Sequence, residues 1–191
     1  MIIKIYKVTI IMCLERMISM DFLELAKKRY SARKYEDKEV EEEKLQKILE
    51  AGRIAPTAAN TQSQRIIVVR EKEGIDKLSK SANVYGAPLV IIACVDHAST
   101  WKRPFDKKDF ADIDVTIVTD HMMLEAAYLG LDSVWIGYFD QVGLKKEFNL
   151  PDTVEPVNIL AIGYAAEQAA SPDRHYKARK PLDHTVFYET Y

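Results

Sequence analysis

The chain has 191 residues, few cysteines, and none of the short motifs that mark several common enzyme classes. Cys13 and Cys94 lie far apart and form no CxxC or metal-spaced cluster, which fits a reducing, cytoplasmic setting. The four histidines are dispersed, and no H-E-x-x-H or G-x-S-x-G sequence occurs, so no local metal site or serine nucleophile is predicted. There is also no glycine-rich phosphate loop, and any bound anion must therefore be held by side chains.

The overall charge excludes two large classes of partner. Apolar residues make up 48% of the chain, charged residues 29%, and the formal net charge is −2, as is ordinary for globular proteins. Because basic and acidic side chains are mixed, nothing favours a nucleic acid or an anionic membrane surface. No nucleic-acid or membrane partner is predicted.

Residues 1–20 differ from the rest because they are apolar with only scattered charges. The apolar run is too short to span a bilayer, and no small-residue cleavage site follows it. The organised pattern begins at Met20-Asp21-Phe22, which resembles a second start site. We therefore expect residues 1–20 to be an N-terminal extension and residues 21–191 to form a single domain.

Hydrophobic periodicity predicts helices and strands that intermix without a regular βαβ repeat. One helix is predicted to start at Asp21, four others cover 39–54, 74–83, 112–131 and 141–148, and strands cover 65–70, 88–95, 134–138 and 157–164. Apolar residues surround more than one face of the 112–131 helix, so we expect it at the centre or in a subunit interface, with Gly130 as its C-cap. The predicted fold class is α+β.

The sequence Arg29-Tyr30-Ser31-Ala32-Arg33 places two guanidinium groups and a hydroxyl at alternate positions, just after the first predicted helix. Guanidinium groups bind phosphate in a bidentate manner, and a serine hydroxyl adds a neutral donor. The simpler interpretation is solvated charge at a helix end. If the stretch does bind phosphate, a phosphorylated cofactor is expected.

Two further segments could contribute to the same ligand. Residues 55–62 form a predicted loop of small and polar residues, which would let a planar heterocycle approach the backbone. Residues 177–182 form a basic patch in the tail. An ordinary helix-to-strand connection and an exposed tail are the alternatives for these two segments.

Four segments together resemble the FMN-dependent nitroreductase family, in the right order from about Met20 to the C-terminus. They are Lys28-Arg29-Tyr30-Ser31-Ala32-Arg33-Lys34-Tyr35, Ala55-Pro56-Thr57-Ala58-Ala59-Asn60-Thr61-Gln62, Gly130-Leu131-Asp132-Ser133-Val134-Trp135-Ile136-Gly137 and Arg179-Lys180-Pro181-Leu182. The resemblance implies a mainly antiparallel central sheet flanked by helices. It also implies an intertwined homodimer with an exchanged C-terminal arm and FMN at the subunit interface.

The resemblance also implies which residues contact FMN. They are Arg29, Tyr30, Ser31, Arg33, Pro56, Thr57, Ala58, Asn60, Gln62, Ile136, Gly137, Lys177 and Arg179. By position, Arg29, Ser31 and Arg33 match phosphate and flavin-edge contacts. The tail residues Lys177 and Arg179 match groups that close the phosphate pocket. The 56–62 loop matches a segment that lies against the flavin ring, from the partner subunit, and Ile136 and Gly137 match backbone near the reactive N5.

The implied activity is ping-pong hydride transfer from NAD(P)H, through flavin N5, to a nitroaromatic, quinone or similar conjugated acceptor. The chemistry then resides on FMN, so no catalytic side chain and no metal are predicted. Residues 96–111 are a candidate substrate lid, with Trp101, Phe105 and Tyr138 as substrate contacts; an ordinary surface loop is the alternative. Other reactions found among relatives, such as dehalogenation or enone reduction, and a non-catalytic flavin-binding module remain alternative functions.

Overall fold

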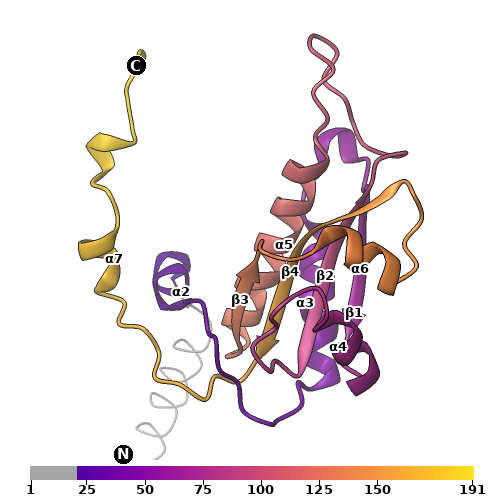
Figure 1. The fold of residues 1–191 in the computed structure, drawn as a ribbon. Coiled ribbons are helices and arrows are strands. Elements are labelled where there is room, and N and C mark those ends of the chain that lie inside the picture. Colours follow the sequence, from indigo (N-terminus) through magenta and orange to yellow (C-terminus); the bar gives the residue numbers. More distant parts are fainter. Residues whose placement is uncertain (1–20) are drawn as a thin grey trace, which may run out of the picture. The chain divides into compact units, whose positions relative to one another are not determined.

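A four-stranded sheet organises the chain (Figure 1). The computed structural model describes residues 21–191, so the expectations for residues 1–20 lie outside the described part. The strands are β1 (Gln64–Val69), β2 (Leu89–Asp96), β3 (Asp132–Ile136) and β4 (Val154–Gly163). They pair in the order β1-β2-β4-β3, and every pair is antiparallel. The predicted α+β class with an antiparallel sheet is confirmed.

Five helices of the described residues follow the predicted segments with shifted ends, and a sixth, α7 in the tail, was not predicted. They are α2 (Phe22–Lys28), α3 (Glu42–Ile54), α4 (Lys72–Leu78), α5 (Ala111–Tyr128), α6 (Gln141–Glu147) and α7 (Arg174–Ala178), with short 3-10 turns η1 (Ala58–Asn60) and η2 (Leu182–His184). Gly130 adopts φ +77° just after α5, and the N–H of Leu131 donates to the carbonyl of Ala126. The predicted glycine end of this helix is therefore confirmed.

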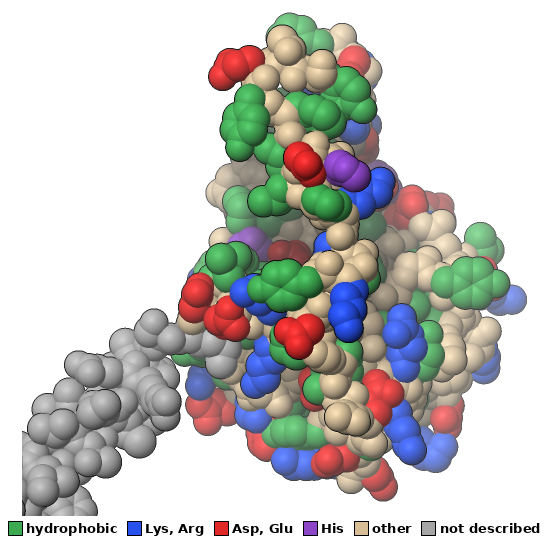
Figure 2. Space-filling view, turned by 90° about the vertical axis from the view of Figure 1, so that its left-hand side faces the viewer, with side chains coloured by type: hydrophobic (Ala, Val, Ile, Leu, Met, Phe, Trp, Pro, Cys, Tyr) green, Lys and Arg blue, Asp and Glu red, His purple; other side chains and the backbone are tan. Residues whose placement is uncertain are grey.

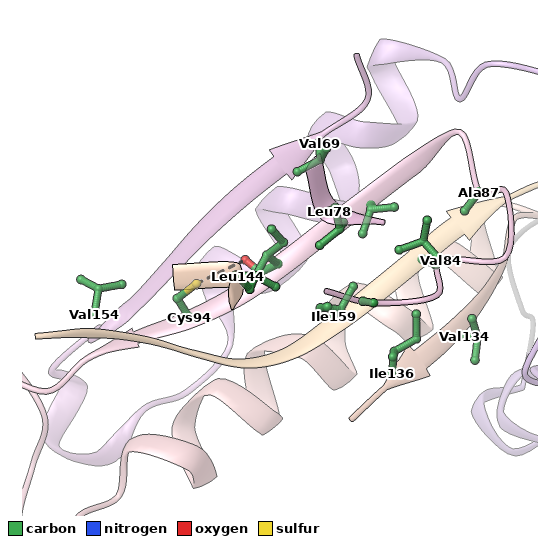
Figure 3. Close-up of a cluster of buried hydrophobic side chains, with 14 residues drawn as sticks. Val69, Leu78, Val84, Ala87, Cys94, Val134, Ile136, Leu144, Val154 and Ile159 are labelled. Atoms are coloured by element: carbon green, nitrogen blue, oxygen red, sulfur yellow. Dashed lines mark hydrogen bonds between the residues drawn. The ribbon is translucent and has the colours of Figure 1, made fainter. Parts of the chain in front are cut away.

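Helices cover both faces of the sheet, which explains why its central strands read as continuous apolar runs. Leu89 and Ile91 pack with side chains of α3 and α5, among them Ile48 and Met122. The alternating residues of β2 face the other way, into a cluster that includes side chains of α4 and α6 (Figure 3). The period of two residues thus divides one strand between two cores.

Cys94 belongs to the second of these clusters and is fully buried (Figure 3). Burial disfavours the charged thiolate and raises the pKa of the thiol to about 12. The sequence-based interpretation of Cys94 as a small buried thiol in a strand is confirmed, because a side chain with this pKa is neither a ready nucleophile nor a metal ligand.

Helix α5 packs closely against α3. A Cβ added to Gly52 would lie 2.9 Å from the Cγ of Met122, so only glycine permits this approach without movement. Both helices keep apolar side chains exposed, namely Ile54, Ile113 and Tyr128. The expected central position of α5 is confirmed by its contacts with α3 and all four strands.

The chain divides into two compact units. The larger unit, Arg29–Ala169, contains the whole sheet. The other unit contains, within the described residues, 21–28 and Ala170–Tyr191. In it the carbonyl of Lys27 lies 3.2 Å from Nε2 of His175, and the tail aromatics Phe187, Tyr188 and Tyr191 are exposed.

Figure 2 shows Lys and Arg side chains interspersed with Asp and Glu over the face in view.

Candidate functional site

The arginine-rich stretch is bound to the edge of the sheet. Ser31 forms a parallel bridge with Ser133 of β3, and the N–H of Ala32 donates to the carbonyl of Ser133 at 3.1 Å. Farther along, the N–H of Glu36 donates to the carbonyl of Tyr164, just after β4, at 2.8 Å. We call residues 29–36 the anchor segment. Its backbone position is set by hydrogen bonds of the kind that join strands.

The phenol of Tyr35 holds the anchor segment against β4 through hydrogen bonds. Its Oη lies 3.0 Å from the carbonyl oxygen of Ala32 and 3.2 Å from that of Ala161. Burial, reinforced by the charge of Asp132, raises the pKa of Tyr35 above its ordinary value. The neutral, hydrogen-bonded phenol is therefore the stable form, and it ties the segment to β4.

Positive and negative groups meet at this corner. The guanidinium of Arg33 lies 5.9 Å from the ring centroid of Tyr85, and its side chain is exposed. The N–H of Arg33 donates to Oε1 of Glu167 at 2.7 Å, while Oδ2 of Asp132 accepts from the N–H of Ala165. Because two carboxylates are already present, the attraction for an anion must come from the arginine side chains.

The donor set of the anchor segment fits a phosphate monoester. Arg29 and Arg33 supply two guanidinium groups within one short segment, and the half-buried Ser31 supplies a hydroxyl between them. Guanidinium groups match the planar, charge-assisted geometry that phosphate oxygens accept. The donor groups that the predicted phosphate site needs are therefore present at this edge of the sheet.

The 56–62 loop has a different construction. Ala59, Asn60 and Gln62 all adopt positive φ, at 51°, 55° and 51°, a region that asparagine tolerates but that is unfavourable for alanine and glutamine. The N–H of Gln62 donates to Oγ1 of Thr57 at 3.1 Å, and the N–H of Ala58 donates to Oδ1 of Asp114 at 2.9 Å. Side-chain acceptors thus stabilise a backbone that is otherwise strained.

The anchor segment and the 56–62 loop lie at opposite corners of the sheet. Ser133, beside Ser31, pairs with Ile162, which pairs with Leu89 at the start of β2. The loop precedes Gln64, which pairs with Val95 near the other end of β2. From strand spacing and rise, the two corners are on the order of 25 Å apart. Within one chain, the structure does not bring these two predicted FMN segments together.

The predicted lid is a short projecting loop of residues 97–110, which we call the tongue. It lies at the same end of the sheet as the 56–62 loop. It leaves β2 after Asp96, and a bridge between Lys102 and Asp109 closes it (Figure 1). Trp101 packs edge-on against Phe110 with ring centroids 4.8 Å apart, whereas Phe105 at the tip is 95% exposed. Of the two predicted aromatic substrate contacts here, only Phe105 is presented to solvent without a packing role.

A histidine fixes the base of this tongue. Nδ1 of His97 lies 3.3 Å from Oδ2 of Asp109, and Nε2 lies 3.1 Å from Oε2 of Glu155 in β4. Oγ1 of Thr100 donates to the same Asp109 oxygen at 3.1 Å. The base of the tongue is therefore tied to the sheet, while its tip projects beyond it.

The remaining predicted residues follow β3 or belong to the tail. Ile136 ends β3 and is buried, Gly137 has open space where a Cβ would lie, and Tyr138 is 96% exposed. Lys177, in α7, and Arg179, which follows it, are exposed within the unit that contains the tail.

Sequence reasoning missed Asp114 and Tyr85 at these two corners. Asp114 is 1% exposed and lies in the acidic first turn of α5, where an acid is ordinarily taken to complement the helix dipole. Tyr85 and Gly86 both have positive φ, and their sequence signals only a turn. Neither signal distinguishes a contact across the fold from local chemistry.

The described residues offer neither a metal site nor a membrane-spanning helix. No group of three or more His, Cys, Asp or Glu side chains between residues 21 and 191 could hold a metal ion. In the same part of the chain, every helix is too short or too polar to cross a membrane.

Comparisons with known proteins agree on one family. A sequence profile described as the nitroreductase family matches residues 26–84 and 76–164. A Methanothermobacter thermautotrophicus protein named as an NADH dehydrogenase/NAD(P)H nitroreductase is 38% identical over 162 residues, which are 81% of this chain and 82% of the relative.

Solved structures give the same result. A nitroreductase family protein of Clostridium difficile 630 is 57% identical with a TM-score of 0.89, and the match covers 90% of this chain and all (100%) of that one. An FMN-dependent nitroreductase of Clostridium difficile R20291 is 31% identical with a TM-score of 0.71, over 87% of this chain and 98% of that one.

Proposed function

The chain belongs to the nitroreductase family, and on that premise we propose that it is an FMN-dependent NAD(P)H oxidoreductase. When bound, FMN supplies a ring that accepts a hydride equivalent from NAD(P)H and passes electrons on to a second substrate. The protein's own residues bind and orient the cofactor and admit the two substrates in turn, in a ping-pong sequence. No side chain is assigned a proton-transfer step.

The observation that carries the proposal is the anchor segment. Hydrogen bonds to β3 and β4 hold its backbone, and this leaves Arg33 exposed on a fixed support. A phosphate bound there places the cofactor relative to the sheet. The resemblance to an FMN-dependent nitroreductase supports FMN as the phosphate-bearing molecule.

The separation of the two corners favours a homodimer. A single flavin nucleotide cannot reach both the anchor segment and the 56–62 loop of one chain, because the corners are on the order of 25 Å apart. If both segments bind FMN, the loop must come from a second copy. The exposed apolar side chains of α3 and α5 supply a surface for that copy, and the exposed tail, with Lys177 and Arg179, supplies its arm.

The tongue of residues 97–110 supports a small conjugated acceptor as the second substrate. Phe105 offers an exposed ring for stacking, and exposed lysines flank the tip at positions 102, 107 and 108. These cations favour acceptors or donors that carry an anionic group. We place the enzyme in the cytoplasm, where NAD(P)H is available.

The experiment is steady-state oxidation of NADH and NADPH by the purified protein, with and without a nitroaromatic or a quinone. We expect a flavin absorption spectrum, FMN release on denaturation, and acceptor-stimulated NAD(P)H oxidation. Bound FMN without stimulated turnover would instead favour a flavin-binding module. Turnover only with a halogenated aromatic or an enone would redirect the proposal to those reactions. A colourless protein that FMN cannot reconstitute would refute it.

A further inference from the structure

Asp114 is a carboxylate buried between α5 and the 56–62 loop. It is 1% exposed, and its Oδ1 accepts the N–H of Ala58 at 2.9 Å. Its Oδ2 is buried and has no hydrogen-bond partner among the described residues. A buried carboxylate is expensive unless something compensates its charge. Its position in the first turn of α5, near the positive end of the helix dipole, supplies part of that compensation, and Ala58 supplies another part.

Helix α5 gives this carboxylate a fixed position. About one turn beyond Asp114, Oγ1 of Thr119 donates to Oδ1 of Asn158 in β4 at 3.0 Å, and both side chains are buried. Val115, next to Asp114, is also fully buried and packs with Ala93 and Val95 of β2. The part of α5 that carries Asp114 is therefore tied to the sheet.

The 56–62 loop depends on such a fixed point. Two of its left-handed residues, Ala59 and Gln62, are of types that disfavour this conformation, and their backbone persists only where the surroundings determine it. The hydrogen bond from Ala58 to Asp114 is the side-chain contact that joins the described loop to α5. Ser63, directly after the loop, is fully buried. The loop therefore cannot move without exposing or straining Ser63.

We propose that Asp114 is a positioning residue that sets the conformation of the 56–62 loop and, through it, the contact of this loop with the flavin ring. The inference rests on the proposed function, because the loop is assigned to the ring there. Asp114 itself touches neither substrate nor cofactor. It acts by holding the Ala58 amide, and this fixes where the polar groups of Thr57 and Asn60 are presented.

Two substitutions at Asp114 and one at its neighbour test the proposal. Asp114→Ala removes the acceptor, Asp114→Asn keeps an oxygen that can accept the Ala58 N–H, and Asp112→Ala removes an exposed acid from the same helical turn. The first readout is hydrogen exchange of the 57–62 amides in the cofactor-free protein. The second is the dissociation constant of FMN together with the flavin absorption spectrum.

We expect Asp114→Ala to accelerate exchange at Ala58 and weaken FMN binding, each about tenfold, with a shifted flavin spectrum. Asp114→Asn should keep the exchange rate of Ala58 and the affinity for FMN within about threefold of the wild type, since a neutral amide oxygen accepts the same hydrogen bond. Asp112→Ala should match the wild type. Equal Ala58 protection in Asp114→Ala and the wild type would overturn the inference, whether or not FMN binds. Absence of FMN binding in the wild type would refute the proposed function alone.

A second variant keeps the test decisive if Asp114→Ala does not fold. Ala58→Pro deletes the donated N–H at the first position of η1, where proline is tolerated. If the hydrogen bond sets the loop, Ala58→Pro should weaken FMN binding to a similar degree, whereas Ala58→Gly, which keeps the N–H, should stay within about threefold of the wild type. Wild-type affinity in Ala58→Pro, or equal losses in Ala58→Pro and Ala58→Gly, would contradict the proposal.

Discussion

The anchor segment and the 56–62 loop are the two proposed FMN contacts, they lie at opposite corners of one sheet, and they are stabilised in different ways. The anchor segment lies against β3 and β4 like an added strand, held by backbone hydrogen bonds and by the side chain of Tyr35, and none of these contacts uses its arginine side chains. The loop has left-handed residues and depends on two side-chain acceptors, Thr57 and Asp114. Substitution of the anchor-segment arginines should therefore change ligand affinity, whereas substitutions that remove the loop's acceptors should change its conformation.

The largest effect is expected from removing the guanidinium groups of the anchor segment. The variant with both Arg29→Ala and Arg33→Ala should bind FMN at least about a hundredfold more weakly, since each charge-assisted contact contributes about 1.5–3 kcal/mol. Equilibrium titration with FMN measures this. Lys34→Ala, which removes a neighbouring exposed cation, is the matched control and should change affinity less than threefold. Equal losses in the control would show that only general charge matters.

The next largest effect is on stability and is expected at Gly163, where β4 contacts Tyr35 of the anchor segment. A Cβ at Gly163 would lie 2.8 Å from Cδ of Pro88 and 2.9 Å from Cδ1 of Tyr35. Gly163→Ala should therefore lower the free energy of unfolding by about 2 kcal/mol through overpacking. Urea unfolding of the cofactor-free protein measures it. Gly137→Ala, where a Cβ meets nothing within 4 Å, should change stability by less than about 0.5 kcal/mol.

A smaller effect is expected at Tyr35, which ties the anchor segment to β4. Tyr35→Phe should lower the free energy of unfolding by about 1 kcal/mol at neutral pH, because the phenol's hydrogen bond is lost. The pKa of Tyr35 is raised in the folded protein, so its contribution is complete below the ordinary tyrosine pKa of about 10 and is lost as the pH rises above it. The difference between wild type and variant should therefore shrink above about pH 10. A constant difference up to pH 11 would contradict this prediction.

The secondary structure and fold class could be predicted because they depend on local pattern. The apolar run at residues 88–95 became β2, and the broadly apolar 112–131 segment became the long helix that packs on the sheet. The ends shifted by a few residues, for example from 157 to Val154 for β4, because strand ends are decided by pairing with neighbours. Such pairing is invisible to periodicity.

The site could be predicted only in part. The residue types of Arg29, Ser31 and Arg33 indicated phosphate, but their position beside Ser133 depends on strand order. The contact of Asp114 with Ala58 joins residues 56 positions apart, and the left-handed backbone at Ala59 occurs at a residue that normally avoids it. Both features arise from tertiary packing, which overrides local preference.

The smallest effect distinguishes strain from stability in the 56–62 loop. Ala59 has φ 51°, so Ala59→Gly relieves strain of about 1–2 kcal/mol, while the extra freedom of glycine in the unfolded chain offsets about 0.5–1 kcal/mol. The net result should be a gain of about 0.5 kcal/mol in the free energy of unfolding, with FMN bound about threefold more weakly because the loop is less rigid.

Ala58→Gly is the matched control, since Ala58 is the neighbouring alanine and does not have a positive φ. It should lose about 0.5–1 kcal/mol of stability, because glycine there gains freedom in the unfolded chain without relieving strain. Opposite signs for the two substitutions, measured by urea unfolding of the cofactor-free protein, would show that the loop stores strain that the anchor segment lacks. If both variants lose stability equally, the left-handed backbone at Ala59 costs nothing and the contrast between the two corners reduces to their hydrogen bonds.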